Sequence, residues 1–135
     1  MTPPEDAPRQ FEFDDSEVSS VRFEGSTLTL RFSAARLREE DPGAHDAGHA
    51  YLPGLVLRLA EARVDGPWAD CFGRLTFGQA VIAGVRHTVL PLLLDMAGPV
   101  HLSLRFANGT VLEASGSALS VQALPGATAA EHYRC

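Results

Sequence analysis

A chain of 135 residues, 45% of them apolar, is long enough to bury one hydrophobic core and too apolar to be a disordered sequence. Its net charge is −6 and it has no basic stripe, which argues against nucleic-acid binding, because neutralisation of phosphates supplies most of that affinity. No apolar run approaches the roughly 18 residues that cross a membrane as a helix, and no C-x-x-C pair offers a thiolate zinc site.

The first ten residues predict a flexible acidic leader. Pro3, Pro4 and Pro8 oppose regular structure there, and an acidic, proline-rich start is the reverse of a secretory signal. We therefore expect a cytoplasmic location. All eleven basic residues are arginine, a pattern that indicates a GC-rich bacterial genome rather than selection for function.

Negative charge is concentrated between residues 5 and 17, where six acidic residues face a single arginine. An acidic segment of this kind steers a basic partner protein towards its binding surface. The alternative is a solvated segment that only aids solubility. We take Glu12, Asp14, Asp15 and Glu17 as the candidate partner-binding residues.

Residues 21–32, "VRFEGSTLTLRF", alternate between apolar and polar side chains as a β-hairpin does. A two-residue type II′ turn at Gly25-Ser26 pairs Phe23 with Leu28 and places all apolar side chains on one face. The following stretch "SAARLREE" is the one helical candidate, with Ser33 as its cap, but the end of a strand followed by one helical turn fits equally well.

The stretch "AHDAGHAY" places His45 and His49 four residues apart, a spacing at which two imidazoles can share zinc. A zinc-protease motif needs H-E-x-x-H on a helix, but here the acid is Asp46 and Gly48 interrupts the pattern. The other histidines are scattered along the chain. We therefore expect a surface loop without a metal ion or other cofactor, and keep His45 and His49 only as metal candidates.

The central segment predicts a strand that changes its buried face. Leu55, Leu57 and Leu59 alternate, after which the apolar positions move to Ala62 and Val64, so we expect a bulge near residues 60–61.

Trp68 and Cys71 follow this segment. Trp68 comes directly after a D-G-P turn, where it either anchors a partner or packs against the edge of the core. Cys71 stands near Trp68 and beside Phe72, which predicts a buried, unreactive thiol, while Cys135 is the last residue.

The C-terminal half contains a second hairpin. A three-residue loop at residues 107–109, with a left-handed Gly109, sets Leu104 opposite Leu112 and keeps one face apolar. Pro91 confines its strand to a sheet edge or an irregular stretch, and "ASGSA" predicts a strand bulge. A last strand ends at residues 125–126.

These patterns predict an all-β protein, an antiparallel sandwich or small barrel of about seven to nine short strands with at most one short helical turn. The domain boundaries we expect are a leader at 1–10, a single β domain at 11–125 and a tail at 126–135. No nucleophile elbow, phosphate loop or catalytic constellation is recognisable, so we expect no enzymatic activity.

The segment "FDDSEVSSVRFEGSTLTLRF", residues 13–32, resembles the opening of several small β-rich bacterial domains, among them immunity proteins of polymorphic toxin systems. The shared pattern is an acid-serine turn, a hydrophobic strand, a tight turn and a second alternating strand. It covers about a sixth of the chain and carries over no functional residue. The resemblance implies a protein that works by binding rather than catalysis.

Three functional hypotheses follow. The first is a non-catalytic protein-interaction module of the immunity or adaptor type, which binds a basic partner and neither nucleic acid nor membrane, and is compatible with a homodimer. The second is a small-ligand binder whose barrel or sandwich opens at one end. The third is a metal-dependent enzyme that uses His45 and His49.

Overall fold

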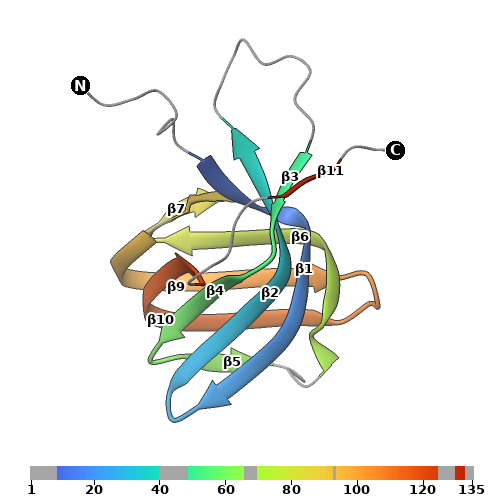
Figure 1. Ribbon diagram of the computed structural model, residues 1–135. Coiled ribbons are helices and arrows are strands. Elements are labelled where there is room, and N and C mark those ends of the chain that lie inside the picture. The colour runs from blue at the N-terminus through green and yellow to red at the C-terminus, as the bar shows by residue number, and fades with distance from the viewer. Residues whose placement is uncertain (1–8, 40–48, 66–69, 93, 125–129, 133–135) are drawn as a thin grey trace, which may run out of the picture.

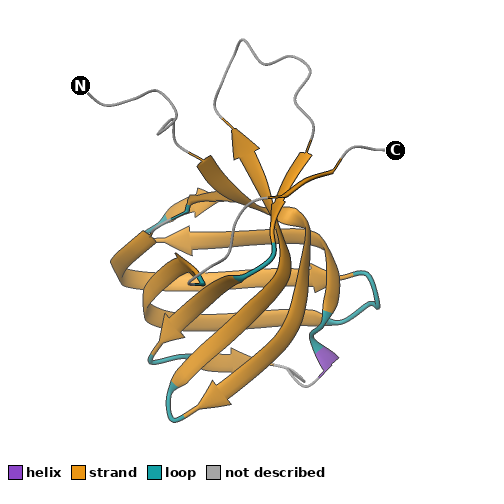
Figure 2. Cartoon of the chain, viewed as in Figure 1, coloured by secondary structure: helices purple, strands orange, loops and turns teal. Residues whose placement is uncertain are grey.

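The computed structural model describes residues 9–39, 49–65, 70–92, 94–124 and 130–132. All its elements are β-strands (Figure 1): β1 (Arg9–Glu24), β2 (Thr27–Glu39), β3 (His49–Leu52), β4 (Leu55–Ala60), β5 (Arg63–Asp65), β6 (Gly73–Ile82), β7 (Val85–His87), β8 (Val89–Pro91), β9 (Leu94–Phe106), β10 (Val111–Ala123) and β11 (Ala130–His132). Within the described chain, a single residue at Asp70 is helical (Figure 2). The prediction of an all-β protein is confirmed.

The strands close into a barrel. The antiparallel circuit runs β1-β2-β4-β10-β9-β6, and β6 returns to β1 through the pairs Glu17–Arg74 and Val18–Gly73. The remaining strands flank this circuit: β3 and β11 extend from β2, β5 pairs with β10, β7 with β6, and β8 with β1. Of the two predicted architectures, the structure is therefore the barrel.

The strands are longer and more numerous than the sequence predicted. β1 has 16 residues and β2, β9 and β10 have 13 each, in a sheet of 11 strands. Bulges inside the long strands interrupt the simple alternation from which short strands were predicted. The helical candidate at residues 33–40 is one such case, because residues 33–39 continue β2 and pair with β1 and β3.

Large apolar side chains fill the barrel. Phe11 contacts both Phe13 and Phe32 edge to face, with ring centroids 4.9 Å apart in each pair. The largest side chains of this core are at most 2% exposed: Phe11, Phe13, Phe32, Leu28, Leu30, Leu55, Leu57, Leu59, Leu75, Ile82, Leu90 and Leu102. Burial of this apolar surface is the main favourable contribution to the fold.

Both predicted hairpins have the predicted register. In the first, Phe23 pairs with Leu28 and Val21 with Leu30, and Gly25 has a φ of 62°, as the first central residue of a type II′ turn requires. In the second, Leu104 pairs with Leu112. Gly109 is left-handed with a φ of 92°, and its N–H donates to the carbonyl oxygen of Phe106 at 2.9 Å.

The predicted change of buried face after β4 is also present. Glu61 has a φ of 51° between β4 and β5, and the buried positions move from Leu59 to Ala62. β10 changes its buried face beside it, from Leu112 and Ala114 to Leu119 and Val121, and its register with β9 shifts between Gly116 and Ala118. A Cβ atom at Gly116 would lie 2.5 Å from the carbonyl oxygen of Ala60, so glycine lets the two irregular strands approach each other.

Pro91 ends β8, which among the described strands pairs with β1 alone and lies at the edge of the sheet, as predicted for its strand. Several predictions fall outside the described residues, namely those for residues 1–8, His45, Trp68, Cys135 and the side chain of His49. The backbone of His49 begins β3 and lies opposite His132 of β11.

Candidate functional site

The four acidic residues predicted to bind a partner lie in β1, around a bulge, where each has a contact within the protein. Asp15 forms an ion pair with the Arg36 guanidinium at 2.8 Å and another with Arg74 at 3.1 Å. These contacts join β1 to β2 and to β6, its neighbours on either side.

The other three acids have weaker contacts. Asp14 accepts the backbone N–H of Gly78 at 3.2 Å, and Glu17 accepts the Ser33 hydroxyl at 3.2 Å. Glu12 lies 3.9 Å from Arg36. The side chains of Glu12 and Asp15 are still 26% and 43% exposed. A role in binding a partner therefore stays a prediction, but these acids also contact the neighbouring strands β2 and β6.

Ser16 shapes the bulge in β1. Its side chain is fully buried and its hydroxyl donates to the carbonyl oxygen of Glu12 at 2.7 Å, while the backbone N–H of Arg36 donates to the same hydroxyl at 2.8 Å. Asp15 next to it has a φ of 70°, a conformation that aspartate tolerates better than most residues. The bulge thus replaces backbone pairing with a serine hydroxyl.

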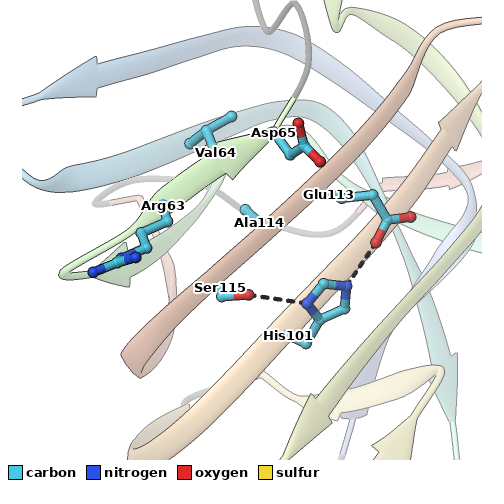
Figure 3. A pocket seen from close by; sticks show the side chains of 7 residues that line it. All are labelled: Arg63, Val64, Asp65, His101, Glu113, Ala114 and Ser115. Atoms are coloured by element: carbon cyan, nitrogen blue, oxygen red, sulfur yellow. Dashed lines mark hydrogen bonds and ion pairs between the residues drawn. The ribbon is translucent and has the colours of Figure 1, made fainter.

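A second polar cluster, not predicted from the sequence, lies on the outer wall of the barrel. His101 and Ser103 on β9 face Ser115 and Glu113 on β10, because His101 pairs with Ser115 and Ser103 with Glu113. Figure 3 shows His101 between Ser115 and Glu113. Their side chains point outward because Leu102 and Ala114, the alternate residues, point into the core.

Hydrogen bonds fix the imidazole of His101 from both sides. Its Nε2 lies 2.6 Å from Glu113 Oε1, and its Nδ1 lies 3.0 Å from Ser115 Oγ. Because a carboxylate only accepts, neutral His101 carries its proton on Nε2, and Nδ1 accepts the hydroxyl of Ser115. Ser103 donates a second hydrogen bond to the same carboxylate oxygen at 2.9 Å.

A hollow of about 270 Å³ opens beside this cluster, over the short strand β5. Arg63 and Asp65 of β5 line one side, and His101, Glu113 and Ser115 line the other. Figure 3 shows the guanidinium of Arg63 directed away from the imidazole. The His101 and Glu113 side chains are 47% and 41% exposed, so a partner can reach both.

The arrangement Ser115–His101–Glu113 has the order of a nucleophile, a base and an acid that orients the base. Acyl transfer also requires N–H donors aimed at the developing oxyanion. Ser115 lies in the middle of β10, between β9 and β5, where the sheet ladders take up the backbone N–H groups. The geometry therefore offers ordered polar contacts more readily than an oxyanion site.

No metal cluster forms among the residues that the structure describes, where His, Cys, Asp and Glu do not gather in groups of three. Cys71 is 1% exposed, which confirms the prediction of a buried thiol. Burial, with a smaller contribution from the charge of Asp70, raises the pKa of this thiol from 9.0 to about 11. Cys71 is therefore protonated at neutral pH.

Comparison with protein families, curated proteins and solved structures finds no match to this chain. The likeness of residues 13–32 to immunity proteins thus stays an expectation from the sequence. No helix in the described part of the chain is long and apolar enough to cross a membrane.

Proposed function

We propose that this protein is a non-catalytic binding module that recognises another protein on the outer wall formed by β5, β10, β9 and β6. The observation that carries this proposal is the fixed polar cluster of His101, Glu113 and Ser115 at an accessible hollow. Side chains that are already ordered lose little conformational entropy when a partner binds, so more of the contact energy appears as affinity.

The row of side chains next to this cluster suits a protein interface. Phe77, Arg105 and Val111 lie side by side on β6, β9 and β10, and the Arg105 guanidinium stands 5.9 Å from the centre of the Phe77 ring. Val111 is 44% exposed. Aromatic and arginine side chains are enriched where proteins meet, and a polar cluster beside them supplies directional hydrogen bonds.

The apolar filling of the barrel favours this proposal over a ligand held inside it. Phe11, Phe13 and Phe32 pack together there among buried leucines. An immunity or adaptor role in a bacterial cytoplasm, and a basic partner at the acids of β1, remain part of the proposal on the strength of the sequence.

Affinity purification with three variants tests the proposed surface. His101→Ala and Ser115→Ala alter the cluster, while Arg38→Gln changes an exposed residue of β2 and serves as the control. We expect at least one protein to be retained by the wild type and the control and lost with both cluster variants. The affinity of that protein, once purified, should fall about tenfold or more in calorimetry with His101→Ala. A partner bound equally by all variants would contradict the proposed surface.

A second candidate function is acyl transfer with Ser115 as nucleophile, and it is favoured by the hydrogen bond of Ser115 to His101 and of His101 to Glu113. A fluorophosphonate probe separates the two candidates, because it labels only an activated serine. Labelling of Ser115 that disappears in His101→Ala would support the hydrolase, whereas an unlabelled wild-type protein would exclude it.

A further inference from the structure

Three arginines gather on the opposite half of the barrel circuit. Arg22 of β1, Arg31 of β2 and Arg58 of β4 line a hollow of about 490 Å³ on the outer wall. Ser20, Glu24 and Thr29 complete the lining. The hollow therefore holds three positive charges and one negative charge in a protein whose net charge is −6.

The strand register brings the three arginines around one point. Thr29 pairs with Arg22 on one side and with Arg58 on the other, so these two arginines lie about 10 Å apart at their Cα atoms. Arg31 follows two residues after Thr29 on the same face, about 7 Å along the strand. The three side chains thus surround Thr29, close enough for their guanidinium groups to reach a common ligand.

The guanidinium groups have little competition from the protein. Arg22 contacts Glu24 at 3.9 Å, in a pair whose side chains are 71% and 78% exposed. Such an exposed ion pair contributes little to the free energy of unfolding, so a ligand can readily take the place of Glu24 beside Arg22. Within the described residues, no ion pair or hydrogen bond involves the side chain of Arg31 or Arg58.

We propose that Arg22, Arg31 and Arg58 bind the phosphate group of a phosphorylated side chain in another polypeptide. A phosphate dianion accepts paired hydrogen bonds from several guanidinium groups at once, and the hydroxyls of Thr29 and Ser20 can donate to its remaining oxygens. This inference is independent of the proposed function, because it uses the other half of the barrel and a different chemistry.

The shape and charge of the hollow select this ligand among phosphate compounds. Sites for small molecules enclose most of the ligand surface, whereas this hollow lies on an open sheet wall across which an extended peptide can run. A nucleic acid carries many phosphates, and the net charge of −6 disfavours those that lie outside the arginine cluster. One cluster of arginines therefore fits one phosphate on a peptide.

Nuclear magnetic resonance of the arginine Nε–H groups tests the proposal on the full chain. The probes are a capped pentapeptide with a central phosphoserine, the same peptide without phosphate, inorganic phosphate, and a single-stranded oligonucleotide. The variants are Arg31→Gln and Arg58→Gln, with Arg86→Gln of β7 as the matched control for an exposed arginine outside the hollow. Glu24→Gln removes the only carboxylate that lines the hollow.

We expect the phosphopeptide to shift the resonances of Arg22, Arg31 and Arg58, and the unphosphorylated peptide to leave them unchanged. Arg31→Gln and Arg58→Gln should each weaken binding about tenfold, Glu24→Gln should tighten it about twofold, and Arg86→Gln should match the wild type. Equal effects of the two peptides, or unchanged binding in both arginine variants, would overturn the proposal.

Two further results would also overturn the choice of ligand. If inorganic phosphate binds as tightly as the phosphopeptide, the site takes a small anion and the peptide contributes nothing. If the oligonucleotide binds more tightly through the same arginines, the wall is a nucleic-acid surface.

Discussion

Gly109 keeps the β9–β10 hairpin in register through a backbone conformation that side chains with a Cβ atom adopt at a cost. Its φ is 92°, and a Cβ atom added there would meet no other atom within 4 Å. Gly109→Val should therefore lower the free energy of unfolding by about 1–2 kcal/mol through backbone strain alone. Chemical denaturation measures this difference. Ala107→Val in the same loop is the control, and an equal loss in both variants would argue against strain at Gly109.

Cys71 should resist alkylation in the folded protein. With its pKa raised from 9.0 to about 11, its thiolate fraction at pH 8 is about 100-fold lower than that of an ordinary thiol. Mass spectrometry after iodoacetamide treatment should show slow modification of Cys71 in the folded state and fast modification in denaturant. Equal rates in the two states would contradict the raised pKa.

The same pKa has a consequence for stability at high pH. The folded state binds the thiol proton more tightly than the unfolded state does. The contribution of this proton to the free energy of unfolding is therefore complete below pH 9 and is lost as the pH rises from 9 towards 11. Cys71→Ser should reduce this part of the pH dependence in denaturation measured across that range.

Single residues show which features of the structure could be predicted from the sequence and which could not. Gly109 and Cys71 were predicted correctly, because their conformation and burial follow from neighbours in the chain. The pairing of His101 with Ser115 was already implied by the hairpin register, in which Leu102 lies opposite Ala114. Alternation of apolar residues defines only the inner face of that hairpin, so it does not single out the polar side chains on the outer face.

The bulge in β1 depends on the buried hydroxyl of Ser16. Ser16→Ala would leave the backbone N–H of Arg36 without the acceptor it has at 2.8 Å. An unsatisfied buried donor costs about 1–3 kcal/mol, so the free energy of unfolding should fall by that amount. Thermal and chemical denaturation measure the loss. Ser20→Ala, on the outer wall of the same strand, should change stability little, and similar losses in both variants would contradict this role.

The acids of β1 show why a charged segment is hard to interpret from sequence. Glu12, Asp14, Asp15 and Glu17 suggested a surface that steers a partner, since nothing local indicated their contacts. Their partners Arg36, Gly78, Arg74 and Ser33 come from β2 and β6, up to 64 residues away in the chain. Neutralising Asp15 would therefore also weaken the contacts among three strands, so a binding test at this residue needs a stability control.

The barrel closes where β1 meets β6, and Gly78 allows that approach. A Cβ atom at Gly78 would lie 2.5 Å from the Cβ of Phe13, whose ring is fully buried. Gly78→Val should therefore lower the free energy of unfolding by about 1–3 kcal/mol or more, because the two strands must separate. Gln79→Val, the half-buried outward neighbour on β6, is the control. Denaturation with equal midpoints for the wild type and Gly78→Val would contradict this account of the closure.

Features that depend on neighbouring residues could be predicted from the amino-acid pattern: the all-β class, both hairpin registers, the change of face near Glu61 and the burial of Cys71. Alternation and turn chemistry act over a few residues, so they can be recognised directly. Three features depend on the three-dimensional fold instead: the closure of the strands into a barrel, the continuation of β2 through residues 33–39, and the hollow lined by three arginines from β1, β2 and β4. These features arise from pairing between distant segments, whose partners are selected by the burial of the whole apolar core and not by any local pattern.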